Sequence, residues 1–309
     1  MKTTPVTRDD LTRSVIAVPP LCRNADERYS LNADENRKLI QHLEGGGIST
    51  LLYGGNANLY HIAVSEYEEL LELLAASVAE DTWVIPSVGP MFGTIMDQAA
   101  ILKRHAFPTA MILPTLFPAT ASGVQVAVRE FVSRSGIPAV LYIKDENYIT
   151  PEAAAELVDE GIISWIKYAI VQENPSVDGY LKRLLELVDP GIIVSGIGEQ
   201  PTVAHLKEFG VAGFTSGCVC VAPSKSMDVL RALQADDIGA AEELRARFAP
   251  LEDLRNAHGP IPVLHHAVAL AGIADTGPHL PLMSSLADEL QALIGPVARE
   301  LLAFEGGAH

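Results

Sequence analysis

Lys167 lies in the middle of an apolar run, "ISWIKYAI" at 163–170, and it is the residue with the clearest chemical potential in this sequence. A short run of β-branched and aromatic residues is typical of a buried strand. Lysine is almost never fully buried without a partner, because removing its charge from water is costly. Two interpretations remain open on spacing alone: Lys167 reaches the surface at the end of its strand or pairs with a structural carboxylate, or it is a reactive amine.

The reactive interpretation rests on the effect of burial. Desolvation lowers the pKa of a lysine, and the neutral amine can attack a ketone to form a Schiff base. The protonated imine is an electron sink, so a neighbouring C–C or C–O bond can break. A phenol nearby could carry protons during imine formation and hydrolysis.

Tyr142 is the phenol that the strand pattern brings to Lys167. The run "PAVLYIK" at 138–144 precedes the lysine strand. Alternation places Trp165 and Lys167 on one face of their strand and aligns Val140 with Tyr142 on the preceding strand. We therefore expect Tyr142 to point to the same side as Lys167, at matching height.

Short apolar runs recur along the chain, each followed by a stretch with helical patterning. The runs lie at 14–19, 48–54, 82–88, 109–115, 138–144, 163–169, 191–196 and 212–217. Three of the helical stretches are 64–80, 150–161 and 200–210, and the last has proline near its start and glycine at its end.

Eight strand–helix units favour a closed (β/α)₈ TIM barrel, because each parallel pair needs a crossover and closure removes both sheet edges. A doubly wound open sheet is the competing architecture. We expect the α/β barrel to occupy residues 1–234, with residues 235–309 forming a C-terminal helical extension packed on it. In such barrels the chemistry lies where strands end, and Lys167 is at the end of the sixth run.

Composition limits the classes of partner. The chain has 309 residues, 48% of them hydrophobic, and a net charge of -17. This charge argues against a nucleic-acid backbone and against an anionic membrane surface as partners. The three cysteines give no paired framework, Cys218 and Cys220 are expected on one strand face, and the first residues lack the apolar core of a signal peptide. We expect a cytoplasmic protein with reduced cysteines.

Several other motifs give weaker indications of function. Glycine turns at 195–199 and 215–218 are where many barrels bind phosphate, but such turns are also ordinary. The "EGGG" stretch at 44–47 is interpreted as a helix stop, and the "CVC" stretch lacks companion ligands for a metal. His265 and His266 are expected to be structural. Residues expected either at the mouth or in the core are Tyr53, Tyr60, Phe117 and Trp165, and Asn56 and Asn58 are candidates for binding substrate hydroxyls.

The sequence resembles the dihydrodipicolinate synthase / N-acetylneuraminate lyase family of class I Schiff-base aldolase barrels over nearly its whole length. The resemblance lies in "YGGNANLY" after the second strand, the tyrosine ending the fifth, "IKYA" in the sixth, "VSGIGE" at the seventh and "PIPVLHHAVALAGIADTGPHLPL" near the end. It implies that Lys167 is the imine-forming nucleophile and that Tyr142 hydrogen-bonds to substrate.

The same resemblance implies the rest of the site. Gly54, Gly55 and Asn56 occupy the family's carboxylate-binding turn, where backbone N–H groups of Gly55 and Asn56 would hold the carboxylate of a 2-oxo acid. Gly196 would present its carbonyl at the mouth. No metal and no organic cofactor is implied, since lysine itself is the electron sink, and a homo-oligomer, dimer or tetramer, is expected.

Departures from the family pattern bear on specificity. The two threonines of the turn are replaced by Gly55 and Asn56, and the paired tyrosines after the fourth strand by Thr115 and Leu116. The arginine that synthases use for a second carboxylate corresponds to Asn147, with Lys144 nearby but out of register, and Tyr168 follows the lysine where an acid is common. These losses argue against the synthase reaction while leaving imine chemistry intact.

The leading hypothesis is therefore a Schiff-base lyase, an aldolase or dehydratase, acting on pyruvate or another 2-oxo acid such as a 2-keto-3-deoxy sugar acid. One alternative is dihydrodipicolinate synthase itself. The other is a catalytically silent barrel that only binds a keto acid.

Overall fold

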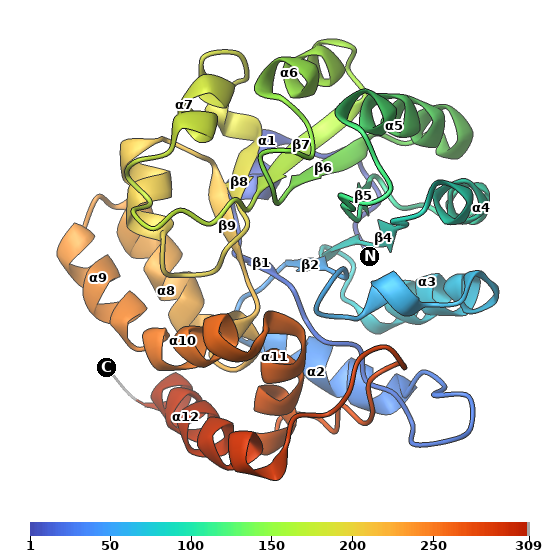
Figure 1. The fold of residues 1–309 in the computed structure, drawn as a ribbon. Helices are drawn as coiled ribbons and strands as arrows, with labels where there is room; N and C mark the ends of the chain where they lie inside the picture. The colour runs from blue at the N-terminus through green and yellow to red at the C-terminus, as the bar shows by residue number, and fades with distance from the viewer. Residues whose placement is uncertain (308–309) are drawn as a thin grey trace.

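The protein is a ring of parallel strands surrounded by helices, as a computed structural model describes it for residues 1–307 (Figure 1). All pairings between strands are parallel, and the order around the ring is β3-β2-β1-β9-β8-β7-β6-β5-β4. The strands are β1 (Ile16–Ala17), β2 (Thr50–Leu52), β3 (Trp83–Ile85), β4 (Ser87–Val88), β5 (Ala110–Ile112), β6 (Ala139–Ile143), β7 (Ile163–Tyr168), β8 (Ile193–Ser195) and β9 (Gly213–Ser216). The expected TIM barrel is confirmed, and the open sheet is excluded.

The third expected strand, 82–88, is interrupted at Pro86. β3 pairs with β2 and β4 pairs with β5, so the two halves of this strand join the ends of the sheet and close the ring. Proline has no N–H to donate to a neighbouring strand, while its carbonyl accepts a hydrogen bond from the Met111 N–H at 2.9 Å. Nine short strands thus occupy the eight strand positions of the barrel, because β3 and β4 share one position.

Helices follow the strands around the outside of the ring (Figure 1). They are α2 (Ala33–Gly45), α3 (Val64–Ser77), α4 (Phe92–Leu102), α5 (Ala121–Ser135), α6 (Pro151–Asp159), α7 (Gly179–Leu185) and α8 (Pro223–Gln234), while α1 (Arg8–Thr12) precedes β1. Their amphipathic faces explain their positions. In α3 the buried stripe consists of Tyr67, Leu70, Leu71 and Leu74. The Thr150 side chain caps α6 by accepting a hydrogen bond from the Ala153 N–H.

One local expectation is refined and another is wrong. The helix expected at 200–210 is present over residues 202–208, but most of it is a π-helix, Ala204–Glu208, after which the Phe209 N–H bonds to the Ala204 carbonyl at 3.1 Å. Cys218 and Cys220 do not share a strand face, because β9 ends at Ser216 and a 3₁₀ turn, Cys218–Cys220, follows it. All three cysteines are buried and unpaired with one another.

Four further helices follow α8: α9 (Ile238–Ala246), α10 (Ala249–His258), α11 (Pro260–Leu270) and α12 (Asp288–Gly306). In Figure 1 they lie together on the side of the ring that carries α8 and α2, in orange and red. The expected extension begins in the turn between α8 and α9, and its last two residues, 308–309, lie outside the described part. None of the described helices combines the length and apolar character needed to cross a membrane.

Candidate active site

A cavity of about 430 Å³ opens at the carboxyl ends of the strands. Its wall combines residues from the turn after β2, from β6 and β7, from the loops after β8 and β9, and from α10 and α11. Of the six predicted site residues, the wall contains Gly55, Asn56, Tyr142, Lys167 and Gly196. The barrel thus brings together segments that are more than a hundred residues apart in the chain.

Lys167 lies at this cavity and is only 5% exposed. It is not at the surface, and it forms no ion pair with a carboxylate in the part of the chain that the structure describes. Burial, together with the positive charges of Lys144 and Arg255, lowers the pKa of Lys167 to about 7. A large fraction of this amine is therefore neutral at neutral pH.

Tyr142 lies directly opposite Lys167 in the register of β6 and β7. The Lys167 Nζ atom is 4.3 Å from the centroid of the Tyr142 ring, as strand alternation predicts. Burial raises the pKa of the Tyr142 phenol, and the neighbouring Tyr60 adds to this effect while Arg255 opposes it. The phenol is therefore protonated at neutral pH and able to donate a hydrogen bond.

The turn after β2 lines the cavity with Gly55 and Asn56. Asn58 has a left-handed backbone conformation, with φ 57°, and its N–H bonds to the Gly55 carbonyl at 2.8 Å. The Asn56 side chain donates to the Val18 carbonyl at 2.9 Å. Within residues 1–307 neither the Gly55 N–H nor the Asn56 N–H has an acceptor. Two such free N–H groups in one turn are suited to an anion.

Gly54 is the predicted site residue that does not line the cavity. It packs beneath the turn, where a Cβ atom would lie 2.8 Å from the Met111 Cε atom and 3.1 Å from the Ser87 Oγ atom. At Gly196, by contrast, a Cβ atom would lie 2.8 Å from the Ala169 Cβ atom and 2.9 Å from the Lys167 Cγ atom. Glycine at 196 is thus required for Lys167 to lie along the wall.

The aromatic residues that the sequence allowed either at the barrel mouth or in the core lie in three different places: the cavity wall, the core and the surface. Tyr60 lines the cavity. Tyr53 and Trp165 are fully buried in the core, and Phe117 is 85% exposed. Asn58 is buried, and its side chain faces the Leu280 carbonyl at 3.4 Å rather than the cavity. His265 bonds to the Gly277 carbonyl and His266 to the Leu286 N–H, so both hold loops.

Sequence reasoning missed Arg255, Glu252 and Glu199. Arg255 comes from α10 and lines the cavity. The Glu252 Oε1 atom accepts the N–H of Glu199 at 2.8 Å and that of Gln200 at 3.4 Å. These N–H groups belong to the end of the 195–199 turn and the residue after it, so an internal carboxylate already occupies donors that a phosphate would need there. The only local signal is the i,i+3 spacing of Glu252 and Arg255, which is common on helix surfaces.

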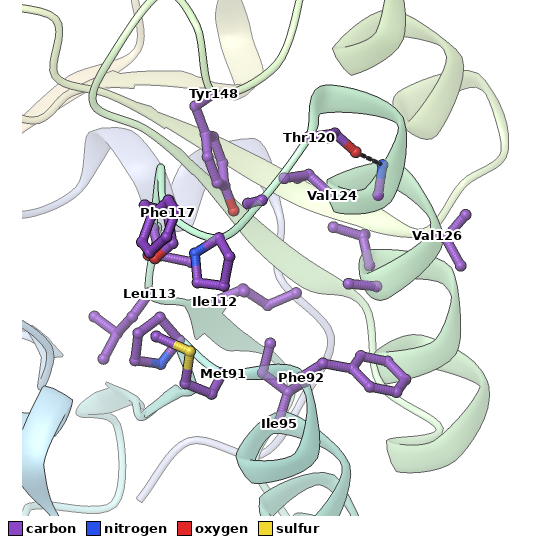
Figure 2. Close-up of a pocket in the computed structure, with 17 residues that line it drawn as sticks. Met91, Phe92, Ile95, Ile112, Leu113, Phe117, Thr120, Val124, Val126 and Tyr148 are labelled. Atoms are coloured by element: carbon purple, nitrogen blue, oxygen red, sulfur yellow. Dashed lines mark hydrogen bonds between the residues drawn. The ribbon is translucent and has the colours of Figure 1, made fainter.

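A second hollow of about 800 Å³ lies between α4 and α5, away from Lys167. Figure 2 shows Phe92 and Ile95 entering it from α4, Val124 and Val126 on the α5 side, and Phe117 at the loop between β5 and α5. Tyr148 is the only titratable residue of its wall, and Thr115, which replaces a family tyrosine, also lines it. Its chemistry is that of an apolar surface, not of a catalytic centre.

In a comparison with protein families, the dihydrodipicolinate synthetase family model matches residues 16–297. A 4-hydroxy-tetrahydrodipicolinate synthase of Xanthomonas axonopodis pv. citri is 27% identical over 293 residues, which cover 89% of this chain and 94% of that protein. A probable 5-dehydro-4-deoxyglucarate dehydratase of Pseudomonas putida is 25% identical over 273 residues, covering 83% of this chain and 86% of that protein.

Solved structures share the fold. Dihydrodipicolinate synthase from Bacillus clausii superposes with a TM-score of 0.82 at 21% identity, covering 96% of this chain and 99% of that one. The sialic acid aldolase of Ruminococcus gnavus superposes with a TM-score of 0.81 at 12% identity, covering 95% of this chain and 99% of that one. The similarity includes the C-terminal helices as well as the barrel.

Proposed function

The chain belongs to the dihydrodipicolinate synthetase family of lyases, and on that premise we propose that it is a Schiff-base lyase acting on a 2-oxo acid through Lys167. The observation that carries the proposal is the buried Lys167 amine, whose pKa is lowered to about 7 beside the Tyr142 ring. A lysine in this state is a nucleophile near neutral pH, whereas an exposed lysine is almost fully protonated.

The proposed chemistry uses the residues of the cavity in sequence. The Lys167 Nζ atom attacks the carbonyl carbon of the 2-oxo acid, and the resulting carbinolamine loses water to give the protonated imine. Tyr142 donates a proton to the departing hydroxyl group and recovers it later. In an aldol cleavage the imine accepts the electron pair of the breaking C–C bond, and the β-hydroxyl group loses its proton to become the aldehyde product. In a dehydration the imine accepts the electron pair of a C–H bond next to it as the proton is removed, and the resulting enamine expels the β-hydroxyl group, which takes up a proton and leaves as water. This chemistry requires no metal and no organic cofactor.

Substrate orientation would come from the turn after β2. The free N–H groups of Gly55 and Asn56 support binding of the 2-oxo acid carboxylate, and Gly54 would support the turn from below. The Gly196 carbonyl would accept a hydrogen bond at the mouth. Pyruvate and 2-keto-3-deoxy sugar acids are the substrate classes that we propose, because both present a carboxylate next to a ketone.

Synthase activity itself is the runner-up. One of the relatives named above is a synthase and the other is a probable dehydratase, so these similarities do not decide which of the two reactions this chain catalyses. Asn147 is exposed, and its side chain bonds to Asp145 at 2.9 Å, so it offers no cation for a second substrate. A coupled assay of pyruvate with aspartate semialdehyde tests this alternative; condensation at an ordinary enzymatic rate would contradict our specificity argument.

Borohydride trapping tests the main proposal. We expect pyruvate and borohydride to add one pyruvate-derived mass increment to the protein, on the peptide that contains Lys167. The increment should be absent in Lys167→Ala. Tyr142→Phe should still form the adduct, about a hundredfold more slowly, because only a proton carrier is lost.

The same experiment separates the lyase from a silent binding protein. A panel of 2-oxo acids that binds, as seen by calorimetry, without any borohydride adduct would favour the silent barrel. An adduct that persists in Lys167→Ala would refute the assignment of the nucleophile. Folding of each variant is checked by circular dichroism, so loss of the adduct reports on chemistry.

We also propose a homo-oligomer, a dimer or tetramer, in the cytoplasm. Support for association comes from the exposed apolar side chains that line the second hollow, Met91, Phe92, Phe117 and Val126, together with the exposed Leu116 next to Phe117 in the chain. An exposed apolar patch of this kind is typical of a surface covered by another protein. The three unpaired, buried cysteines support a reducing compartment.

A further inference from the structure

The wall of the Lys167 cavity carries positive side chains and no negative ones. Its ionisable residues other than tyrosine are Lys144, Lys167 and Arg255, and no aspartate or glutamate lines it. The chain as a whole has a net charge of -17, so this local excess of cations is opposite to the average surface. A concave site lined by one sign of charge concentrates ligands of the other sign. The Schiff-base reaction uses only Lys167, which leaves two cations without a role.

Arg255 is held with part of its guanidinium free. The side chain is only 9% exposed, and its Nε and Nη2 atoms donate to the Asn256 Oδ1 atom at 3.2 and 3.1 Å. The Nη1 atom donates no hydrogen bond within residues 1–307 and lies 3.7 Å from the Glu252 Oε1 atom. Burial without full pairing is costly for a cation, so a ligand that supplies the missing acceptor would be stabilised.

The loop after β8 packs closely against both Lys167 and Arg255. A Cβ atom on Gly196 would lie 2.9 Å from the Lys167 Cγ atom, and a Cβ atom on Gly198 would lie 2.6 Å from the Arg255 Nη1 atom. Gly198 has φ +112°, a conformation that other residues rarely adopt. Both glycines line the cavity, so this loop approaches both cationic side chains closely within one wall.

Glu252 does not fully neutralise Arg255. Its Oε1 atom is already shared by the N–H groups of Glu199 and Gln200. Burial and the neighbouring Glu199 carboxyl raise the pKa of Glu252 to about 8, although Arg255 opposes this rise. The buried pair therefore does not carry two full negative charges at neutral pH, and Arg255 remains a source of positive potential for the cavity.

Lys144 is the second unused cation. It lies two residues beyond Tyr142, so strand alternation directs it to the same side. It is exposed and lines the cavity, and it pairs with no carboxylate in the part of the chain that the structure describes. Lys144 and Arg255 are both close enough to lower the pKa of Lys167, which places them within electrostatic reach of the reacting centre.

We propose that Lys144 and Arg255 form a second anion-binding subsite, so that the substrate is a 2-oxo acid with another anionic group at its far end. This inference rests on the proposed function, because the first carboxylate is assigned to Gly55 and Asn56. The shared chemistry is an anionic oxygen group, either carboxylate or phosphate. The planar guanidinium of Arg255 suits both, since it can donate two parallel hydrogen bonds.

Two matched pairs of probes test the subsite by the concentration at which borohydride trapping on Lys167 is half-maximal. The first pair is 2-oxoglutarate and 2-oxopentanoate, which have equal chain length and differ in the second carboxylate. The second pair is 2-keto-3-deoxygluconate and its 6-phosphate. We expect the more anionic member of at least one pair to saturate at a concentration about tenfold lower, because a charge-assisted hydrogen bond contributes this much. The pair that discriminates identifies carboxylate or phosphate.

Variants assign the preference to the two side chains. Lys144→Met and Arg255→Gln should each reduce the preference about three- to tenfold. The ratio within a pair cancels any change in the amount of neutral Lys167, which both variants would otherwise alter. Lys182→Met removes an exposed lysine outside the cavity and should leave the ratio unchanged. If Arg255→Gln fails to fold, the exposed Lys144 still provides the test.

The outcomes distinguish failure of the second anion-binding subsite from failure of the Schiff-base proposal on which it rests. If pyruvate is trapped on Lys167 but both pairs give ratios near one, the second subsite is wrong and the Schiff-base proposal stands. A preference that survives in both Lys144→Met and Arg255→Gln would also overturn the subsite. If none of the acids, pyruvate included, forms an adduct, the two proposals fail together.

Discussion

Burial of Lys167 has opposite consequences for reactivity and for stability. The folded protein keeps this amine at a pKa of about 7, against 10.5 for an ordinary lysine. Between these values the unfolded chain binds a proton that the folded chain does not. The free energy of unfolding therefore rises with pH from about 7 to 10.5, and the full penalty is present below pH 7. By this linkage the cost is roughly 3 to 5 kcal/mol.

Replacing Lys167 by methionine should therefore stabilise the protein. We expect the denaturation midpoint of Lys167→Met to exceed that of the wild type at pH 7, by an amount equivalent to a few kcal/mol, because an apolar side chain of similar length removes the desolvation cost. The difference should shrink as pH rises toward 10.5. Urea denaturation followed by circular dichroism across this pH range measures it.

The rate of borohydride trapping should also depend on pH, because it follows the fraction of Lys167 that is neutral. It should increase as pH rises through about 7 and then level off, because only the neutral amine attacks. Lys182→Met, which changes an exposed lysine, serves as the matched control and should alter neither profile. Equal stability of Lys167→Met and wild type at pH 7 would mean that Lys167 is charged and solvated in the folded protein.

At the scale of secondary structure, strand alternation predicted the central pair of the site. The register of β6 and β7 depends on a period of two, so Tyr142 and Lys167 could be placed opposite each other from their positions in two apolar runs. The break at Pro86 follows from proline chemistry and could have been included. The turn after β2 was located correctly, although its lower residue, Gly54, packs below the cavity.

Arg255 could not be predicted in the same way. Its contribution depends on how α10 packs over the barrel mouth, a long-range arrangement that no local period encodes. The sequence around Glu252 and Arg255 has the spacing of an ordinary solvent-exposed helix. The π-helix at Ala204–Glu208 was missed for a similar reason, since its register is set by packing and not by its proline and glycine ends.

Glu252 connects α10 to the loop after β8, and this connection gives a testable prediction. In the folded protein the pKa of Glu252 is raised to about 8 from 4.5, first by burial and then by Glu199. Between these values the unfolded chain is deprotonated and the folded chain is not, so stability falls as pH rises from about 4.5 to 8. Glu252→Gln keeps an oxygen that accepts both N–H groups and removes the ionisation.

We expect Glu252→Gln to be more stable than the wild type at pH 8, on the order of 1–2 kcal/mol, and similar to it near pH 4.5. Urea denaturation at the two pH values measures the difference. Asp253→Gln, on the neighbouring exposed position of the same helix, is the control for a change of charge on α10. A loss of stability at pH 8 in Glu252→Gln would show that Glu252 is ionised and acts as the partner of Arg255.

At the scale of the whole molecule, the closed barrel leaves no sheet edge on which copies could pair. Association must therefore use helix and loop surfaces. The exposed apolar side chains around the hollow of Figure 2 are the natural candidate, and they come from α4, α5 and the loop between β5 and α5. Because the net charge is -17, repulsion between copies opposes association and salt should favour it.

Phe117→Glu should weaken the proposed oligomer. Phe117 is 85% exposed, and burying such a side chain contributes about 2 kcal/mol. In a two-fold interface the change occurs twice, so the dissociation constant should rise about a thousandfold. We expect sedimentation velocity to show a dimer or tetramer for the wild type and a smaller species for Phe117→Glu. Val177→Glu, at another exposed apolar residue outside the hollow, should leave the wild-type species unchanged. A monomeric wild type at every salt concentration, or an oligomer unaffected by Phe117→Glu, would contradict the proposed interface.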